Sequence, residues 1–246
     1  MRRSWRALGG ALMVFALLSG AAGATGPTGL PNPKADNAAP VFPAGVSAAR
    51  VHVWMARALS VRLEALTVVS AAVSASRYLT TADRAALDSV VAADDSGLAG
   101  LSAALAGDVS IPQLQTAADA MVLDYRVFSL LVPEVRAVIA TDHELNKVVA
   151  LTALEPSIQT AITTERQAGH RTGAAEKLYV KLVALLGGME TTLGNSSTAV
   201  LAVTPATYSS APATLAASAS ELVTASTQLA VAHTDVHDIV KLLGAP

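Results

Sequence analysis

A seven-residue spacing of aliphatic side chains near the C-terminus constrains the fold of this 246-residue chain more than any other feature. The first row consists of Leu215, Leu222, Leu229, Val236 and Leu243. A second row follows its first four members by four residues and consists of Ala219, Ser226, His233 and Val240. Rows with this spacing stay on one face of a helix and pack against other helices with a left-handed crossing. The sequence therefore predicts a long final helix that packs closely on its neighbours.

The rest of the chain from Ser47 onward has the same helical character. Apolar residues recur at intervals of three, four and seven, and β-branched clusters separated by hairpin turns are missing. Residues suited to begin helices, as N-caps, precede these runs: Ser47, Thr80 or Thr81, Ser110 and Thr172. The predicted fold class is all-α, an antiparallel up-and-down bundle of five or six long helices.

Proline and glycine set the expected boundaries between helices. An unbroken helix from Ile111 to Gly169 would be roughly 88 Å long at 1.5 Å per residue, so we expect a break at Pro133. We expect a kink at Pro156 and an interruption or kink at residues 94–97, where the sequence reads Asp-Asp-Ser-Gly. Residues 204–212 are expected to form a loop.

The N-terminus has the pattern of a secretory signal peptide over residues 1–24. Three arginines precede Ala7–Leu18, an apolar run of 12 residues that is too short to span a bilayer. Small residues at Ala22 and Ala24 then mark a cleavage site, which predicts cleavage near Ala24 and a secreted or envelope-associated protein. General secretion fits the flanking residues better than twin-arginine export. Both routes stay open.

The expected organisation after the leader is a Pro/Gly-rich linker over residues 25–45 and a single helical-bundle domain over residues 46–246. Five prolines in the linker fix φ and withhold backbone donors, so we expect an extended, mobile segment. No membrane span is expected after signal cleavage.

Composition restricts the classes of function. The chain has no cysteine, which rules out disulfides, thiol nucleophiles and Cys-ligated metals. Removal of the leader leaves 14 basic and 19 acidic residues, a net charge of −5. A mildly acidic protein with few, scattered aromatic residues lacks the electrostatic footprint of a nucleic-acid-binding protein. We therefore expect no nucleic-acid partner.

His233 and His237 are the one candidate metal pair. Imidazoles at i and i+4 lie on one helix face and can chelate a divalent cation. The zincin glutamate is missing, since Thr234 stands in its place, and a third ligand would have to come from a distant histidine or carboxylate. The alternative is a partly buried histidine beside a solvated one near a helix C-terminus.

Asp124, Tyr125 and Arg126, with nearby Asp119, bring two carboxylates, a phenol and a guanidinium together in sequence. The spacings do not place the two aspartates well on one face, and they allow Arg126 to pair with either only in part. We expect an interhelical salt bridge or hydrogen bond that holds the bundle together.

The chain resembles exported, Ala-rich helical proteins of high-GC actinobacteria, a group without an assigned activity. The likeness rests on the signal peptide, the Ala-rich helices, and the segments Tyr78–Arg84, Asp124–Val127 and His233–Lys241. It covers most of the mature chain, and it implies export and a helical fold without supplying any catalytic residue.

The sequence favours a non-enzymatic protein of the cell envelope or extracellular space that acts by interaction with an unknown protein or envelope component, with no cofactor. One alternative is divalent-metal binding through His233 and His237. Another is a carrier for a small apolar ligand, held between helices.

Overall fold

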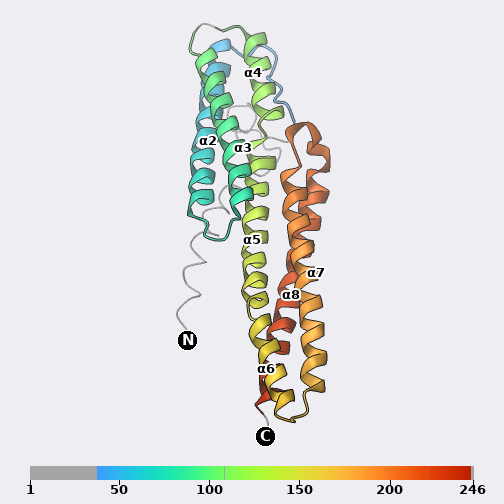
Figure 1. Ribbon diagram of the computed structural model, residues 1–246. Coiled ribbons are helices and arrows are strands. Elements are labelled where there is room, and N and C mark those ends of the chain that lie inside the picture. Colours follow the sequence, from blue (N-terminus) through green and yellow to red (C-terminus); the bar gives the residue numbers. More distant parts are fainter. Residues whose placement is uncertain (1–37, 108, 245–246) are drawn as a thin grey trace. The chain divides into compact units, whose positions relative to one another are not determined.

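The structure is a computed structural model that describes residues 38–107 and 109–244, and these residues form an all-α protein (Figure 1). The predicted fold class is confirmed. The elements are α2 (Ala48–Ala75), α3 (Thr81–Ala104), α4 (Ile111–Leu123), the π-helical turn η1 (Val127–Leu131), α5 (Val132–Thr152), α6 (Glu155–Gln167), α7 (Gly173–Leu201), the 3₁₀ segment η2 (Pro205–Ser210) and α8 (Ala211–Leu243). Five of the described helices have 21 to 33 residues. The predicted signal peptide lies outside the described residues.

Helix starts follow the predicted capping residues. The four confirmed N-cap positions are Ser47, Thr80, Ser110 and Thr172. The Thr80 hydroxyl accepts a hydrogen bond from the backbone N–H of Asp83 at 3.0 Å, which satisfies a donor of the first turn of α3. Thr172 differs, because its hydroxyl donates to the carboxylate of Glu176 at 2.8 Å instead of capping the backbone.

The expected helix boundaries at proline are shifted. The break predicted at Pro133 occurs earlier, between the end of α4 at Leu123 and the start of η1 at Val127. Pro133 instead is the second residue of α5, and the helical run that begins with η1 at Val127 continues through it without a break. Pro156 lies in the first turn of α6, so the predicted kink is a break just before it. The loop expected at 204–212 contains the 3₁₀ segment η2.

The interruption expected at residues 94–97 is wrong, since α3 is continuous from Thr81 to Ala104. Asp94 faces the interior and is 9% exposed, so it acts as a core residue and not as a cap. Gly97 lies where a Cβ would come within 2.3 Å of the Tyr125 hydroxyl oxygen. Glycine in a helix costs about 1 kcal/mol relative to alanine, and here it makes room for a tyrosine.

The described chain groups into two compact units, where the sequence analysis expects one domain over residues 46–246. Unit 1 includes residues up to Arg136 together with Val203–Ala211, and unit 2 includes Ala137–Ala202 and the residues from Pro212 onward. One boundary falls inside helix α5, between Arg136 and Ala137, and the other two lie on either side of Val203–Ala211, which contains most of the loop expected at 204–212.

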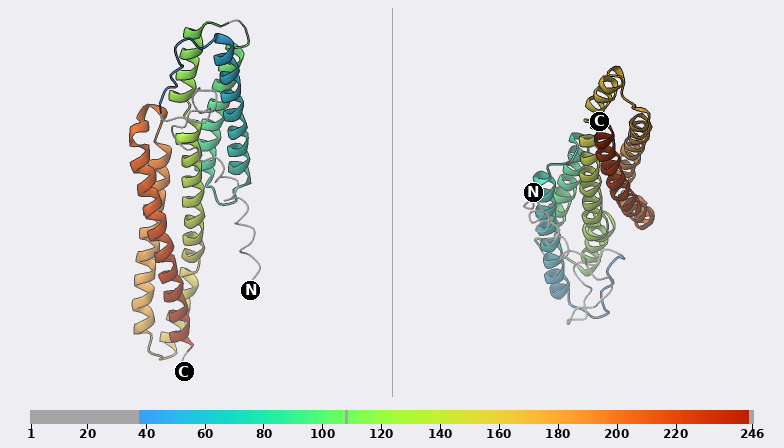
Figure 2. Two further views of the ribbon diagram at one scale, coloured as in Figure 1. Left: turned by 180° about the vertical axis from the view of Figure 1, so that it is seen from behind. Right: turned by 90° about the horizontal axis from the view of Figure 1, so that it is seen from below.

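Unit 1 is built on the α2–α3 hairpin. The two helices lie side by side in the views of Figures 1 and 2, and residues 76–80 join them, so they run antiparallel. Arg84 of α3 donates to the backbone carbonyls of Val73 and Ser76 and so satisfies the last carbonyls of α2. At the other end of the hairpin, the His52 ring lies 2.6 Å from the carbonyl oxygen of Leu105.

The last part of the expected linker packs on unit 1. Pro40 is buried, and its carbonyl accepts a hydrogen bond from the Gln115 side chain at 2.7 Å. Phe42 meets Trp54 edge to face, with ring centroids 5.3 Å apart. The expectation of an extended, mobile linker therefore fails for residues 40–42, and residues 25–37 lie outside the described part.

Unit 2 has an aliphatic core drawn from α5, α6, α7 and α8. One row of the predicted heptad in α8 is confirmed, since Leu229 is 4% exposed and Leu222, Val236 and Leu243 pack on the same core. The prediction that the second row packs against other helices is wrong, because its four members are all exposed. The second row that is actually buried follows the first four members of the aliphatic row by three residues instead of four. It consists of Ser218, Ala225, Ala232 and Ile239.

Helix α2 is long and apolar enough to cross a membrane on length and composition alone. A core helix of a folded domain meets the same criteria, and ten α2 residues are buried in the structure. One of the ten is Arg62, whose side chain is wholly buried.

Candidate functional site

The junction between α4 and η1 is the most distorted piece of backbone in the described chain. Arg126 has φ = 41°, and it is the only described residue other than glycine with a positive φ. The left-handed region costs an L-residue on the order of 1–2 kcal/mol, and such residues gather at functional sites and tight switches. Surrounding contacts must therefore hold this turn in place.

The turn sends two neighbouring side chains to different elements. Tyr125 packs against Gly97 of α3. The Arg126 guanidinium lies over the ring of Tyr208 in η2, 4.0 Å from the ring centroid, in cation–π geometry. Leu130, Val203 and Ala211 form a small apolar cluster against which Tyr208 also packs. The strained turn thus ties η2 to the rest of unit 1.

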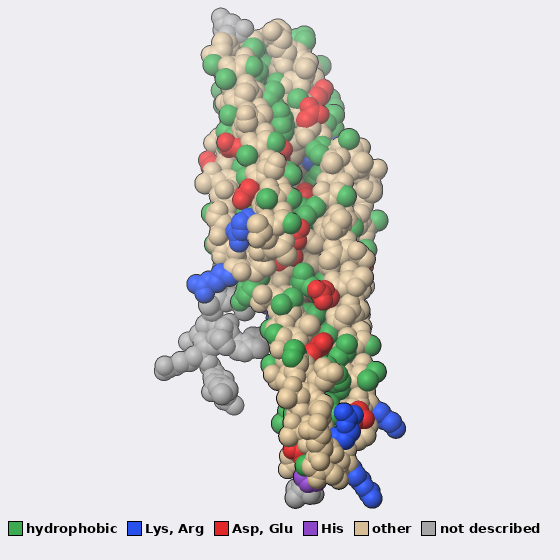
Figure 3. Space-filling model, in the orientation of Figure 1, with side chains coloured by type: hydrophobic (Ala, Val, Ile, Leu, Met, Phe, Trp, Pro, Cys, Tyr) green, Lys and Arg blue, Asp and Glu red, His purple; other side chains and the backbone are tan. Residues whose placement is uncertain are grey.

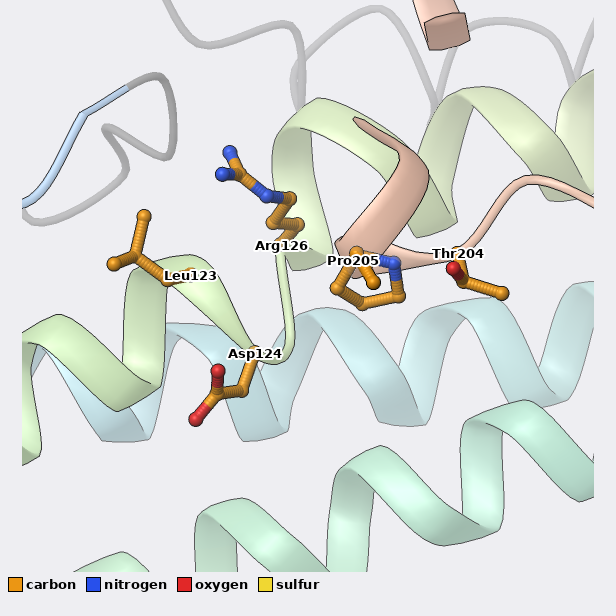
Figure 4. A pocket seen from close by; sticks show the side chains of 6 residues that line it. Leu123, Asp124, Arg126, Thr204 and Pro205 are labelled. Carbon is orange, nitrogen blue, oxygen red and sulfur yellow. The ribbon is translucent and has the colours of Figure 1, made fainter. Parts of the chain in front are cut away.

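The sequence predicts that Arg126 pairs with Asp119 or Asp124 only in part and that it contributes a contact between helices, and the guanidinium does contact Tyr208 of η2. The side chains of Asp124 and Arg126 point in different directions (Figure 4). Asp119 instead accepts a hydrogen bond at 2.7 Å from Gln115 one turn earlier, the same amide that holds Pro40. Helix α4 ends at Leu123, so Asp119 lies on the helix and Asp124 and Arg126 lie in the turn that follows it, where the sequence predicts one continuous helix.

An open hollow of about 550 Å³ adjoins this junction (Figure 4). Its lining residues are Leu123, Asp124, Arg126, Thr204, Pro205 and Ala206. The carboxylate and the guanidinium stand apart and do not converge on one point in the hollow. This arrangement lacks the paired nucleophile and base, or acid and base, that acyl transfer and hydrolysis need.

Unit 1 also buries charge in its interior. The Arg62 side chain is wholly buried, donates to the Ala58 carbonyl at 3.2 Å and lies 5.4 Å from the centroid of the Phe128 ring. Glu134 on α5 is 3% exposed and interacts with the carboxyl group of Asp94 on α3. Burial first, and the nearby Asp94 second, raise the pKa of Glu134 to about 8. Glu134 therefore keeps its proton at neutral pH.

The Asp94–Glu134 pair lies in the interior of unit 1. Both carboxyl groups are buried, and neither residue lines the hollows described here. A coupled carboxyl pair can act as an acid and a base when a ligand reaches it. The sequence analysis treated Asp94 as part of a turn and did not single out Glu134, because the two lie 40 residues apart and nothing local joins them.

The histidine pair lies on the outer surface of α8. His233 and His237 are both exposed, and the His237 ring is 3.6 Å from the Asp238 carboxylate. His233 belongs to the row that the structure places outside the core, so its expected partial burial is wrong. Across residues 38–107 and 109–244, no group of three or more His, Asp or Glu side chains could hold a metal ion. Metal binding by this pair stays a prediction without a third ligand.

A second hollow of about 550 Å³ lies between α2 and α3. Its lining residues are Leu66, Thr67, Ser70, Ala71 and Ser74 of α2 and Asp88, Val91, Ala92 and Asp95 of α3. Leu66 and Val91 are buried and form the apolar floor, while Asp88 and Asp95 are exposed. We call this hollow the α2–α3 groove. The sequence analysis did not identify it, because it depends on which helix faces meet.

Comparisons of this chain with protein families, with curated proteins and with solved structures found no match. The resemblance to exported actinobacterial proteins stays a prediction. The site therefore has to be judged by its own geometry.

Proposed function

We propose that this chain is an exported, non-enzymatic protein of the cell envelope or extracellular space, which acts by binding a protein or envelope component. The observation that supports this most strongly is the α2–α3 groove. It combines a buried apolar floor with carboxylates at the rim, on two helices that both contribute buried residues to the core of unit 1. Binding surfaces commonly pair an apolar centre with a polar rim.

The surface around the groove supports recognition by shape and charge. In Figure 3, hydrophobic side chains are scattered over α2 and α3 with acidic groups between them, and the most prominent basic side chains over these helices lie near the turn that joins them. Among the described residues, Asp88 and Asp95 have no ion-pair partner, so their charges are available to another molecule.

Export is the first part of the proposal to test. The protein secreted by the organism that encodes it should begin near Thr25 when its N-terminus is sequenced, because cleavage is predicted near Ala24. Material that still begins at Met1 would overturn the proposed location.

Native mass spectrometry of that secreted material tests the second part. We expect a bound protein or envelope fragment that dissociates on unfolding. A metal adduct would favour binding through His233 and His237, and a bound apolar molecule would favour the carrier function. The proposal would be contradicted if the secreted protein had no bound molecule in the native mass spectra, showed no catalysis in its own culture fluid and did not bind to any envelope fraction.

A further inference from the structure

We propose that the α2–α3 groove is the docking site for a basic amphipathic α-helix of a protein partner. This inference rests on the proposed function and names the class of partner. We infer a helical occupant because the groove lies between two antiparallel helices with small side chains, and a basic one because Asp88 and Asp95 line it.

The exposed face of α2 has its own heptad spacing, separate from the core. Residues that are exposed or half-buried recur along it at alternating intervals of four and three: Ala49, Val53, Ala56, Ser60, Leu63, Thr67, Ser70 and Ser74. On α3 the exposed residues with the same alternation are Asp88, Ala92, Asp95, Ala99 and Ser102. This is the spacing with which helices pack against each other in bundles and coiled coils. The members of these rows that line the α2–α3 groove are Thr67, Ser70 and Ser74 of α2 and Asp88, Ala92 and Asp95 of α3. A groove between two antiparallel helices suits a third helix.

The size of the side chains allows close approach. Most members of the two rows are Ala, Ser or Thr, so the backbone of a third helix can come within the 8–10 Å that packed helices adopt. The Thr67 hydroxyl donates to the Leu63 carbonyl of its own helix, which leaves its methyl group for contact. Val53, on the same face, is 69% exposed. From Thr67 to Ser74, the part of the α2 row that lines the groove extends about 10 Å at 1.5 Å per residue, which is the length of about two helical turns.

The negative charges beside the groove favour a basic occupant. Asp88 and Asp95 lie seven residues apart, which is about 10 Å along α3, and both rows lack Lys and Arg. Arg84, one turn before Asp88, is engaged with the C-terminal carbonyls of α2. A helix with Lys or Arg at seven-residue intervals beside its apolar row would meet both carboxylates.

Two other occupants fit the charge less well. A second copy that offered the same face would bring Asp88 and Asp95 against like charges. An anionic membrane surface would be repelled in the same way. A basic helix gains from both the apolar floor and the acidic rim.

The test uses the mature chain and a synthetic probe. The probe is a labelled 21-residue helical peptide with Ala and Leu on one face and Lys at seven-residue intervals, and a matched peptide has Glu at the Lys positions. Fluorescence anisotropy at low salt should show binding of the Lys peptide alone. The D88N/D95N variant should weaken it about tenfold, since two exposed ion pairs contribute up to roughly 1 kcal/mol each.

Matched controls separate the groove from general acidity. E190Q/D238N removes two exposed charges from unit 2 and should leave the affinity unchanged. A92W should fill the groove and abolish binding, and circular dichroism of every variant checks that it is folded. Moderate salt should weaken binding of the parent.

Three results would overturn the inference: equal binding of the Lys and Glu peptides, parental affinity in D88N/D95N, or binding of the mature chain to lipid vesicles in competition with the Lys peptide. If such a result came with a bound protein in the native mass spectra, the proposed function would stand and only this partner class would fall. If neither test showed binding, both would fall.

Discussion

The two units use similar Ala-rich helices but treat buried charge differently. In unit 2, the buried Asp235 carboxylate of α8 lies 3.0 Å from the Lys181 ammonium group of α7. In unit 1, Glu134 lies near a second carboxyl group, that of Asp94, and the pKa of Glu134 rises to about 8. A carboxyl group that must keep its proton in the folded chain, as Glu134 must, makes stability fall as pH rises.

The difference shows how small side chains can build two kinds of core. In unit 2, buried residues recur every seven residues along α7 and along α8, and the buried hydroxyls of Ser196 and Ser218 form a hydrogen bond of 3.0 Å between the two helices. The interior of unit 1 is less regular, because Tyr125 fits against a glycine and Arg62 lies beside an aromatic ring. We expect mutations in unit 2 to act through packing, and mutations in unit 1 to act through charge as well.

The largest expected effect is that of Leu229→Asp in unit 2. It places an unpaired carboxylate in the aliphatic core, which costs on the order of 4 kcal/mol or more. Thermal unfolding followed by circular dichroism should show a melting temperature lowered by many degrees. Val223→Asp is the matched control, because Val223 lies on the outer face of α8 and is 69% exposed. Equal melting of the two variants would contradict the assigned core of unit 2.

The next effect is the pH dependence of unit 1. Below pH about 4.5, Glu134 is protonated in both the folded and the unfolded chain. Between pH 4.5 and about 8 only the folded chain keeps the proton, so stability is lost as pH rises, by up to about 1.4 kcal/mol per pH unit, and then levels off. Glu134→Gln should remove this dependence of stability on pH. The melting temperature of the variant should therefore exceed that of the parent by more and more as pH approaches 8.

Chemical denaturation at pH 5, 6.5 and 8 measures this dependence of stability on pH. Glu190→Gln, at an exposed position of α7, is the control and should follow the parent at all three values. Parallel curves for Glu134→Gln and the parent would show that Glu134 is not a buried, protonated group.

Local signals in the sequence were sufficient for the fold class and the helix starts. Ser47, Thr80 and Ser110 act within one turn of their own position, so the chemistry that caps a helix is visible in a short window. The break at residues 124–126 was missed, because neither glycine nor proline marks it. Contacts of Tyr125 and Arg126 with α3 and η2, distant in sequence, fix that turn.

The candidate site could be predicted only in part, because it too depends on contacts between residues that are distant in sequence. Asp124 and Arg126 were identified from their types, but their directions depend on where α4 ends. The Asp94–Glu134 pair and the α2–α3 groove arise where separate helices meet. Periodicity identified the heptad of α8, but it could not decide whether Ala232 or His233 faces inward, since both continue a three–four pattern.

A smaller expected effect tests whether the row of Ala232 or the row of His233 in α8 faces the core. Ala232→Leu should overpack the core of unit 2 and cost about 1–3 kcal/mol, because Ala232 has no exposed surface. His233→Leu changes a neighbouring, exposed position and should leave the melting temperature almost unchanged. If the two costs were reversed, the row predicted from the sequence would be right after all.

The smallest effect concerns His233 and His237, and we expect none. A structural metal would link binding to folding, so a strong chelator would lower the melting temperature of freshly purified protein. We expect the parent and the H233A/H237A variant to melt alike with and without the chelator, because the described residues supply no third ligand. A parent that is sensitive to the chelator, beside an insensitive double variant, would establish a metal site on unit 2.

The proposal that the protein acts by binding through unit 1 can be tested in the secreting organism itself. A photoreactive benzoylphenylalanine is placed either at Ala92 in the α2–α3 groove or at Val223 on the outer face of α8, and the secreted protein is irradiated in its own culture. The account predicts a discrete protein adduct from position 92, with the cross-link mapped to a basic helical segment, and none from position 223. An adduct from position 223 alone, or the same adducts from both positions, would contradict it.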